Sequence, residues 1–253
     1  TRFKVLRPFF TERINVFNTP LELFYSRRIG AKGDIHGGIK ATGKLKQGFE
    51  FGVIGNLTGE SFFSGSLPNA EKASFGVMRV KKDVLGSSSI GIIAATNEEK
   101  DRFNRIEGVD GSFLLSDNDF LDVQIASGQN ELGYDQNMAY NFSYLRTGDL
   151  FGVSLNMERI EPAFEINRVG YIRKEANRGW NKGSGIFRYS PRINKNNIRR
   201  IIVNVEQEYN MDLFTNRYID NWLLTNQKFI PDEKFGTVQH SENERTINGG
   251  IRE

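Results

Sequence analysis

Two carboxylates in the sequence have the spacing that a glycosidase could use. Glu206 and Glu208 are separated by one residue, and side chains so placed on a strand share a face, about 6.6–7 Å apart. Carboxylate pairs at such separations perform acid–base chemistry on glycosidic bonds. A polar row on the water-facing side of a strand gives the same pattern without chemistry. We therefore predict that the chain is not an enzyme, with a glycoside hydrolase that uses these two residues as the alternative.

A pair of adjacent arginines is the second candidate site. Arg27 and Arg28 precede Ile29 and Gly30, and guanidinium groups bind phosphate and carboxylate through charge-assisted hydrogen bonds. The pair is therefore a candidate for binding a ligand or a lipid phosphate. The other interpretation is that it anchors its own segment to acidic side chains inside the fold.

The remaining reactive residues predict neither a metal nor a cofactor. The chain has no cysteine and two histidines, which excludes thiolate metal sites and leaves little material for histidine chemistry. Asp117, Asp119 and Asp122 lie around a tight turn without a full calcium-loop pattern. The glycine-rich residues 30–38 lack the lysine of a phosphate-binding loop. A formal charge of only +3, with both signs interspersed, argues against a nucleic acid partner.

The elements that would position these residues show a period of two. In residues 149–158 the apolar side chains alternate with polar or small ones, which is the pattern of a strand with two different faces. The apolar positions there are Phe151, Val153, Leu155 and Met157. Two interpretations remain open, because such a face can point to lipid or to a soluble core.

This alternation recurs along most of the chain and predicts an all-β fold. The marked strands span residues 38–46, 49–58, 73–82, 88–96, 107–116, 119–128, 138–147, 149–158, 165–173, 181–190 and 198–209, with a less regular one at 217–229. They form an antiparallel up-and-down meander of about 11–12 long strands. No apolar run approaches the roughly 20 residues of a spanning helix.

Strand and loop lengths favour part of a transmembrane β-barrel. Strands that cross a membrane need about 9–11 residues, whereas strands of soluble sheets have about five or six. Short turns, such as Asp117-Asn118, mostly alternate with long connections, such as residues 59–72 and 97–106, as in barrels whose two rims differ. Aromatic residues near strand ends could form interfacial girdles or fill a core: Phe49, Phe75, Phe120, Tyr144, Phe151, Tyr171 and Tyr189.

Several short motifs resemble one bacterial outer-membrane family. They are residues 7–12 (RPFFTE), 23–30 (LFYSRRIG), 34–44 (DIHGGIKATGK), 104–110 (NRIEGVD) and 164–173 (FEINRVGYIR). The order and spacing are similar to those of a large barrel domain of unknown function that follows a periplasmic carbohydrate-binding module of family nine. The resemblance covers most of residues 7–210. The sugar-binding module would precede Thr1 and is absent here, so no carbohydrate-binding residue is carried over.

The resemblance implies a place in the cell envelope and a division of the chain. It implies that residues 1–37 lead into the barrel, that residues 38–230 form the barrel segment, and that residues 231–253 are a polar tail or loop. It also implies the outer membrane of a Gram-negative bacterium, with membrane lipid as a partner and a glycan reached through the absent module. Because an open sheet edge is not tolerated in lipid, the chain would have to close on itself, pair with another chain that completes the barrel, or continue beyond these residues. The expected function is structural, or transport or capture of a nutrient such as a glycan. The alternative is a soluble β-sandwich or barrel that binds or hydrolyses polysaccharide.

Overall fold

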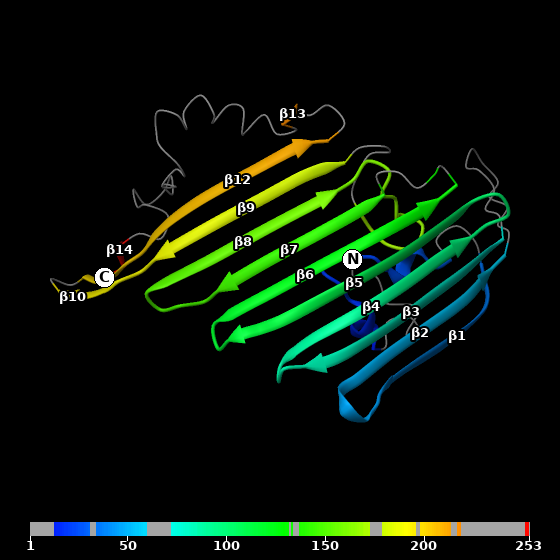
Figure 1. Cartoon of the computed structure of the whole chain (residues 1–253), viewed down its shortest axis with the longest axis horizontal. Coiled ribbons are helices and arrows are strands. Elements are labelled where there is room, and N and C mark those ends of the chain that lie inside the picture. The colour runs from blue at the N-terminus through cyan, green and yellow to red at the C-terminus, as the bar shows by residue number, and fades with distance from the viewer. Residues whose placement is uncertain are drawn as a thin grey trace, which may run out of the picture. The chain divides into compact units, whose positions relative to one another are not determined.

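The protein is an all-β antiparallel meander. A computed structural model describes residues 13–30, 34–59, 72–131, 133, 137–172, 179–195, 198–213, 217–218 and 251–252. Its main sheet has 11 hydrogen-bonded strands in the order β1-β2-β3-β4-β5-β6-β7-β8-β9-β12-β13, so nearly every strand pairs with its neighbour in sequence (Figure 1). A second sheet has the order β10-β11-β14. The predicted all-β meander is confirmed.

The elements of the fold have the following bounds. The short 3-10 helices are η1 (Ile14–Phe17), η2 (Ser26–Arg28) and η3 (Lys46–Gly48), and the strands are β1 (Ile35–Lys44), β2 (Phe49–Thr58), β3 (Ala73–Val84), β4 (Ser88–Glu98), β5 (Phe103–Ser116), β6 (Asp119–Asn130), β7 (Met138–Arg146), β8 (Phe151–Ile160), β9 (Trp180–Tyr189), β10 (Arg192–Lys195), β11 (Ile198–Ile201), β12 (Val203–Asp212), β13 (Arg217–Tyr218) and β14 (Ile251–Arg252). No helix in these ranges has the length and apolar character needed to span a membrane.

The prediction of a strand at residues 165–173 is wrong. Up to residue 172, where the description of this segment ends, it forms turns instead of a strand. Its polar side chains bind its own backbone: the Asn167 amide donates to Glu165 Oε1 at 2.7 Å, and the Ile172 amide donates to Asn167 Oδ1 at 3.0 Å. Such local bonds compete with a strand ladder. Ile166 and Val169 are buried within this segment of turns, so apolar residues that suggested a strand are packed without one.

Other differences concern where elements begin and end. The predicted long connection at 97–106 is a tight hairpin, closed by the Glu99 amide donating to the Arg102 carbonyl at 2.8 Å. The predicted strand 198–209 is two strands, β11 and β12, in different sheets. Most of the segment predicted at 217–229, and the tail at 231–253 except β14, lie outside the described residues.

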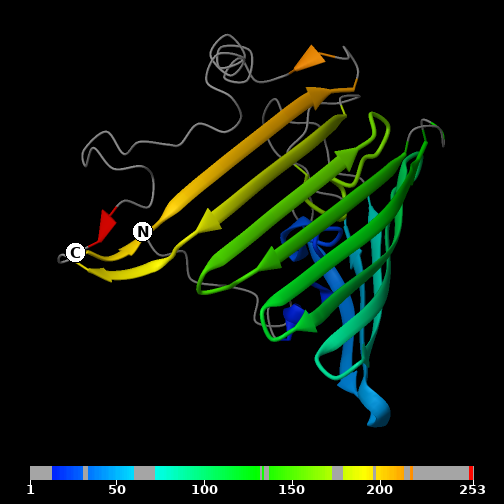
Figure 2. The ribbon, with the colours of Figure 1, turned by 60° about the vertical axis from the view of Figure 1, so that its left-hand side comes forward.

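The chain divides into two compact units, which are described separately. The first unit comprises residues 1–111, 124–139 and 161–177. One face of its sheet is packed against residues 13–30 and 161–172, which we call the covering layer, and we call this face the covered face. Figure 2 shows the dark-blue part of this layer lying against the blue and cyan strands. The opposite face is called the open face.

Small residues of the covered face make room for the covering layer. A Cβ at Gly52 would lie 2.6 Å from Phe17 Cζ, and a Cβ at Gly108 would lie 2.7 Å from Leu23 Cδ1. Phe17 and Leu23 are 1% and 0% exposed. Full burial of such side chains contributes about 1.5–3 kcal/mol each. Glycine is required here by close approach, and the N-terminal segment is fixed to the sheet by this packing.

The second unit comprises residues 112–123, 140–160 and 178–253. Its strands β8, β9 and β12 pair in continuous antiparallel register and run side by side in Figure 2. Ser154 lies opposite Ile186 and Asn156 opposite Ser184, so these residues share a face, which we call the polar face. Val153 lies opposite Phe187 on the other side, which we call the apolar face.

Candidate functional site

The open face of the first unit is an exposed apolar surface. Met78, Ile92, Val109 and Ile125 come from four different strands, and they are 51%, 52%, 53% and 46% exposed. They occupy the outward positions of an alternation in which Val77, Ile93, Ile106 and Ala126 are buried on the other side. Soluble proteins rarely expose apolar residues in one contiguous area of this kind. This surface therefore requires an apolar environment or a partner.

The apolar face of the second unit has the same character. Phe151, Leu155, Met157 and Phe187 are exposed side chains on β8 and β9. Leu155 and Tyr209 lie beside the glycines of β9: a Cβ at Gly183 would lie 2.1 Å from Tyr209 Cε1. The alternation predicted for residues 149–158 is present, with Phe151, Leu155 and Met157 exposed on its apolar side, and Asn156 on its polar side is exposed as well.

The covered face of the first unit contains a buried ion pair. Arg79 on β3 donates from both terminal guanidinium nitrogens to the carboxylate of Asp110 on β5, with Nη2 and Oδ2 2.7 Å apart. The two side chains are 2% and 9% exposed. The guanidinium crosses Gly91 on β4, where a Cβ would lie 2.7 Å from Nη2. The pair joins β3 to β5 beneath the covering layer.

Buried amide side chains lie on the same covered face. The Oε1 of Gln124 accepts the Leu21 amide at 2.6 Å, and Nδ2 of Asn104 donates to the Glu165 carbonyl at 2.6 Å. Both side chains are 1% exposed, and Asn56 and Asn97 are also buried. The covering layer is thus attached through polar contacts as well as apolar ones. The face turned towards the layer therefore mixes these polar side chains with apolar ones such as Val77 and Ile106, whereas the open face is mainly apolar.

The predicted site Arg27-Arg28 belongs to the covering layer. Arg28 Nε donates to the Gly170 carbonyl at 3.1 Å, and Nη2 donates to Asn167 Oδ1 at 3.3 Å. Its guanidinium also lies 5.7 Å from the ring centre of Tyr171. Arg28 therefore joins the two segments of the layer, through a carbonyl and an amide rather than through the acids that the sequence suggested. Arg27 is exposed, 6.0 Å from the Tyr25 ring centre.

Glu206 and Glu208 lie on one face of β12, as predicted. They pair in register with Ile186 and Ser184 of β9, which places them on the polar face of the second unit. Asn156 extends this polar row, since its Nδ2 donates to Ser184 Oγ at 3.4 Å. The arrangement fits a hydrated polar surface, which is one of the two interpretations that the sequence left open.

Cations and aromatic rings meet near the tight turns. In the first unit the Lys82 ammonium lies 4.5 Å from the ring centre of Phe49. In the second unit the Arg146 guanidinium lies 5.1 Å from the ring centre of Phe151 and binds Asp119, which also accepts the Tyr144 hydroxyl at 2.7 Å. Aromatic rings with adjacent cations are typical of surfaces at a membrane–water boundary.

An exposed carboxylate in the turn after β7 binds two arginines of the following strands. Asp149 binds Arg192 at 2.8 Å and also binds Arg200. Hydrogen bonds from Arg192 and then Arg200 hold the pKa of Asp149 below the ordinary value for an aspartate. This carboxylate links the β7–β8 turn to β10 and β11.

Sequence reasoning missed Arg79 and Asp110. A signal was present, because Arg79 alternates in phase with Val77 and lies between the apolar residues Met78 and Val80. An opposite charge on a nearby strand could have suggested a partner, but the choice of Asp110 depended on a strand register that the sequence does not give.

Comparison with known families, curated proteins and solved structures gave no match.

Proposed function

We propose that this chain is a segment of a β-barrel in the bacterial outer membrane, with a structural or transport role and no enzymatic activity of its own. The observation that carries the proposal is the presence of exposed apolar residues on the sheet together with charged and amide side chains that are buried. Apolar residues such as Ile92 and Leu155 are exposed, while Arg79 and Gln124 are buried and the Asp110 side chain is only 9% exposed. A barrel in lipid has this arrangement, with an apolar exterior and a polar interior.

Strand length supports the same proposal. The strands β1 to β9 and β12 have 9 to 14 residues each. A tilted strand needs about 9–11 residues to cross the hydrocarbon region. The cation–aromatic pairs Lys82–Phe49 and Arg146–Phe151 lie near strand ends, where a membrane boundary would place them.

The proposal requires further strand pairing. Among the described strands, β1 and β13 are the two ends of the main sheet order. Unpaired strand edges are not tolerated in lipid, because their backbone groups would have no hydrogen-bonding partner. The sheet therefore closes in the membrane, through other residues of the polypeptide or through another chain. Passage or capture of a nutrient, including a glycan, would use the interior of the completed barrel.

The proposal is tested by the dependence of the fold on detergent. The purified chain is transferred from detergent micelles to plain buffer, and its far-ultraviolet circular dichroism and its gel mobility with and without heating are measured. We expect a β-sheet spectrum in detergent, a mobility shift on heating, and loss of soluble folded protein without detergent. A monomer that stays folded in plain buffer would refute the membrane assignment.

The alternative is a soluble polysaccharide-binding protein or hydrolase, and one observation favours it. Glu206 and Glu208 share the polar face of β12, two positions apart, which is compatible with paired carboxylate chemistry. If the chain proves soluble, the decisive assay is glycan hydrolysis by Glu206→Gln and Glu208→Gln. Loss of activity in both variants would favour the hydrolase.

A further inference from the structure

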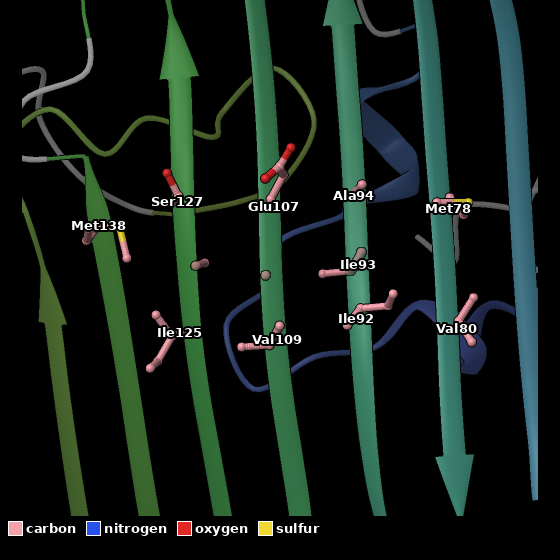
Figure 3. Close-up of a pocket in the computed structure, with 12 residues that line it drawn as sticks. Met78, Val80, Ile92, Ile93, Ala94, Glu107, Val109, Ile125, Ser127 and Met138 are labelled. Atoms are coloured by element: carbon pink, nitrogen blue, oxygen red, sulfur yellow. The ribbon is translucent and has the colours of Figure 1, made fainter.

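The open face of the first unit contains a groove of about 380 Å³. Figure 3 shows its walls: Met78 and Val80 on one side, Ile125 and Met138 on the other, with Val109 between them. A volume of this order matches that of small-molecule sites, which range over about 300–1,000 Å³. Apolar side chains and the small residue Ala94 form most of the lining. The groove fits an extended hydrocarbon chain.

One carboxylate interrupts this apolar lining. Glu107 on β5 is the single charged residue among the described residues that line the groove, and it is exposed. A charge on the lipid-facing side of a barrel costs free energy that increases with depth. In the membrane, Glu107 would therefore favour a ligand that brings a positive charge and hydrogen-bond donors.

The position of Glu107 along β5 indicates its depth. Arg105 lies two residues away on the same face, over the ring of Phe103 at 4.7 Å, and its Nε donates to Glu98 Oε1 at 2.6 Å. This ion pair lies at the β4–β5 hairpin, where the strands end. Same-face positions are about 6.6–7 Å apart along a strand. Glu107 thus lies one same-face position from the polar residues of the β4–β5 hairpin, and the apolar groove extends along the strands on its other side.

We propose that the groove binds a phospholipid whose headgroup carries a primary ammonium. One acyl chain would lie along Met78, Val109 and Ile125, and the ammonium would donate hydrogen bonds to the Glu107 carboxylate. Ammonium–carboxylate hydrogen bonds are charge-assisted and are stronger than neutral ones. A choline headgroup has no N–H donors, so it cannot form them. This inference rests on the proposed function, because it requires that the open face contact lipid.

The test uses the full chain in detergent and two synthetic lipids with identical acyl chains, one with an ethanolamine and one with a choline headgroup. Native mass spectrometry measures the fraction of protein that retains each lipid. We expect about tenfold tighter retention of the ethanolamine lipid, as one charge-assisted hydrogen bond would give. Glu107→Gln should remove the preference, and Glu50→Gln, which removes a carboxylate from β2 outside the groove, should leave it unchanged.

Two further measurements separate recognition of the acyl chain from recognition of the headgroup. Val109→Trp fills the groove and should weaken retention of both lipids. Free phosphoethanolamine, which has the headgroup without chains, should not compete at the same concentration. Equal retention of the two lipids by the unmodified chain, a preference that persists in Glu107→Gln, or full competition by free phosphoethanolamine would each overturn the lipid site.

The failure of this inference can be told apart from failure of the proposed function. The heat-dependent mobility shift is recorded on the same samples. A chain that folds only in detergent but shows no lipid preference refutes the lipid site alone. A chain that is folded and soluble in plain buffer refutes both.

Discussion

The ion pair between Arg79 and Asp110 gives the sharpest prediction of stability. Both side chains are almost fully buried, at 2% and 9% exposure, and two parallel hydrogen bonds join them. Removing the carboxylate by Asp110→Leu would leave a buried guanidinium uncompensated. The expected loss is about 3–5 kcal/mol of unfolding free energy. Replacing both residues, with Arg79→Met and Asp110→Leu, should recover most of that loss, because no unpaired charge then remains.

The assay is urea unfolding from detergent micelles, followed by far-ultraviolet circular dichroism. The matched control is the exposed pair of Lys44 and Asp83, which are 2.9 Å apart with side chains 62% and 41% exposed. Asp83→Asn should cost no more than about 1 kcal/mol, since exposed ion pairs contribute little. A loss below about 1 kcal/mol for Asp110→Leu would refute the reasoning, because it would mean that water or another group reaches Arg79.

Two other predictions concern packing and pH. Gly108→Ala places a methyl group against Leu23 and should lower the unfolding free energy by about 1–3 kcal/mol through overpacking. Urea unfolding should show a smaller loss for the same substitution in a Leu23→Ala background. An equal loss in both backgrounds would contradict the contact. Asp149 has a pKa depressed below the ordinary value of 3.8 by Arg192 and Arg200, so its stabilising contribution is present at neutral pH and is lost as the pH falls through the depressed value. A carboxyl carbon NMR titration checks this: a midpoint at or above the ordinary value would contradict it.

The period of two predicted most strands and their two faces, because alternation follows from backbone geometry alone. It could not predict what covers each face. The sequence left open whether Phe75 and Tyr144 form a girdle or fill a core: Phe75 lies in register between Asn56 and Asn97 on the covered face, while Tyr144 binds Asp119 beside a tight turn. Which of these faces an aromatic side chain occupies depends on the position of the covering layer. The sequence does not give that position, because it is set by tertiary contacts.

In residues 165–172 the pattern of the sequence predicted a strand that the structure does not have. A strand was predicted from residue 165 onward, but Ile166 is buried within a segment of turns whose amide groups bind Glu165 and Asn167 side chains. Among the site residues, the common face of Glu206 and Glu208 followed from their spacing. The engagement of Arg28 with Gly170 did not, because the two residues are 142 positions apart.

If alternate residues of each strand face lipid, single labels along β8 will show it. The chain has no cysteine, so single cysteines can be placed at Val153, Ser154, Leu155 and Asn156 without a background label. Spin labels at these sites are measured in vesicles for collision with oxygen, which concentrates in lipid, and with a water-soluble nickel complex. We expect oxygen access at 153 and 155 and nickel access at 154 and 156 if the apolar face of β8 meets lipid. Equal access at all four positions, or the reverse order, would contradict it.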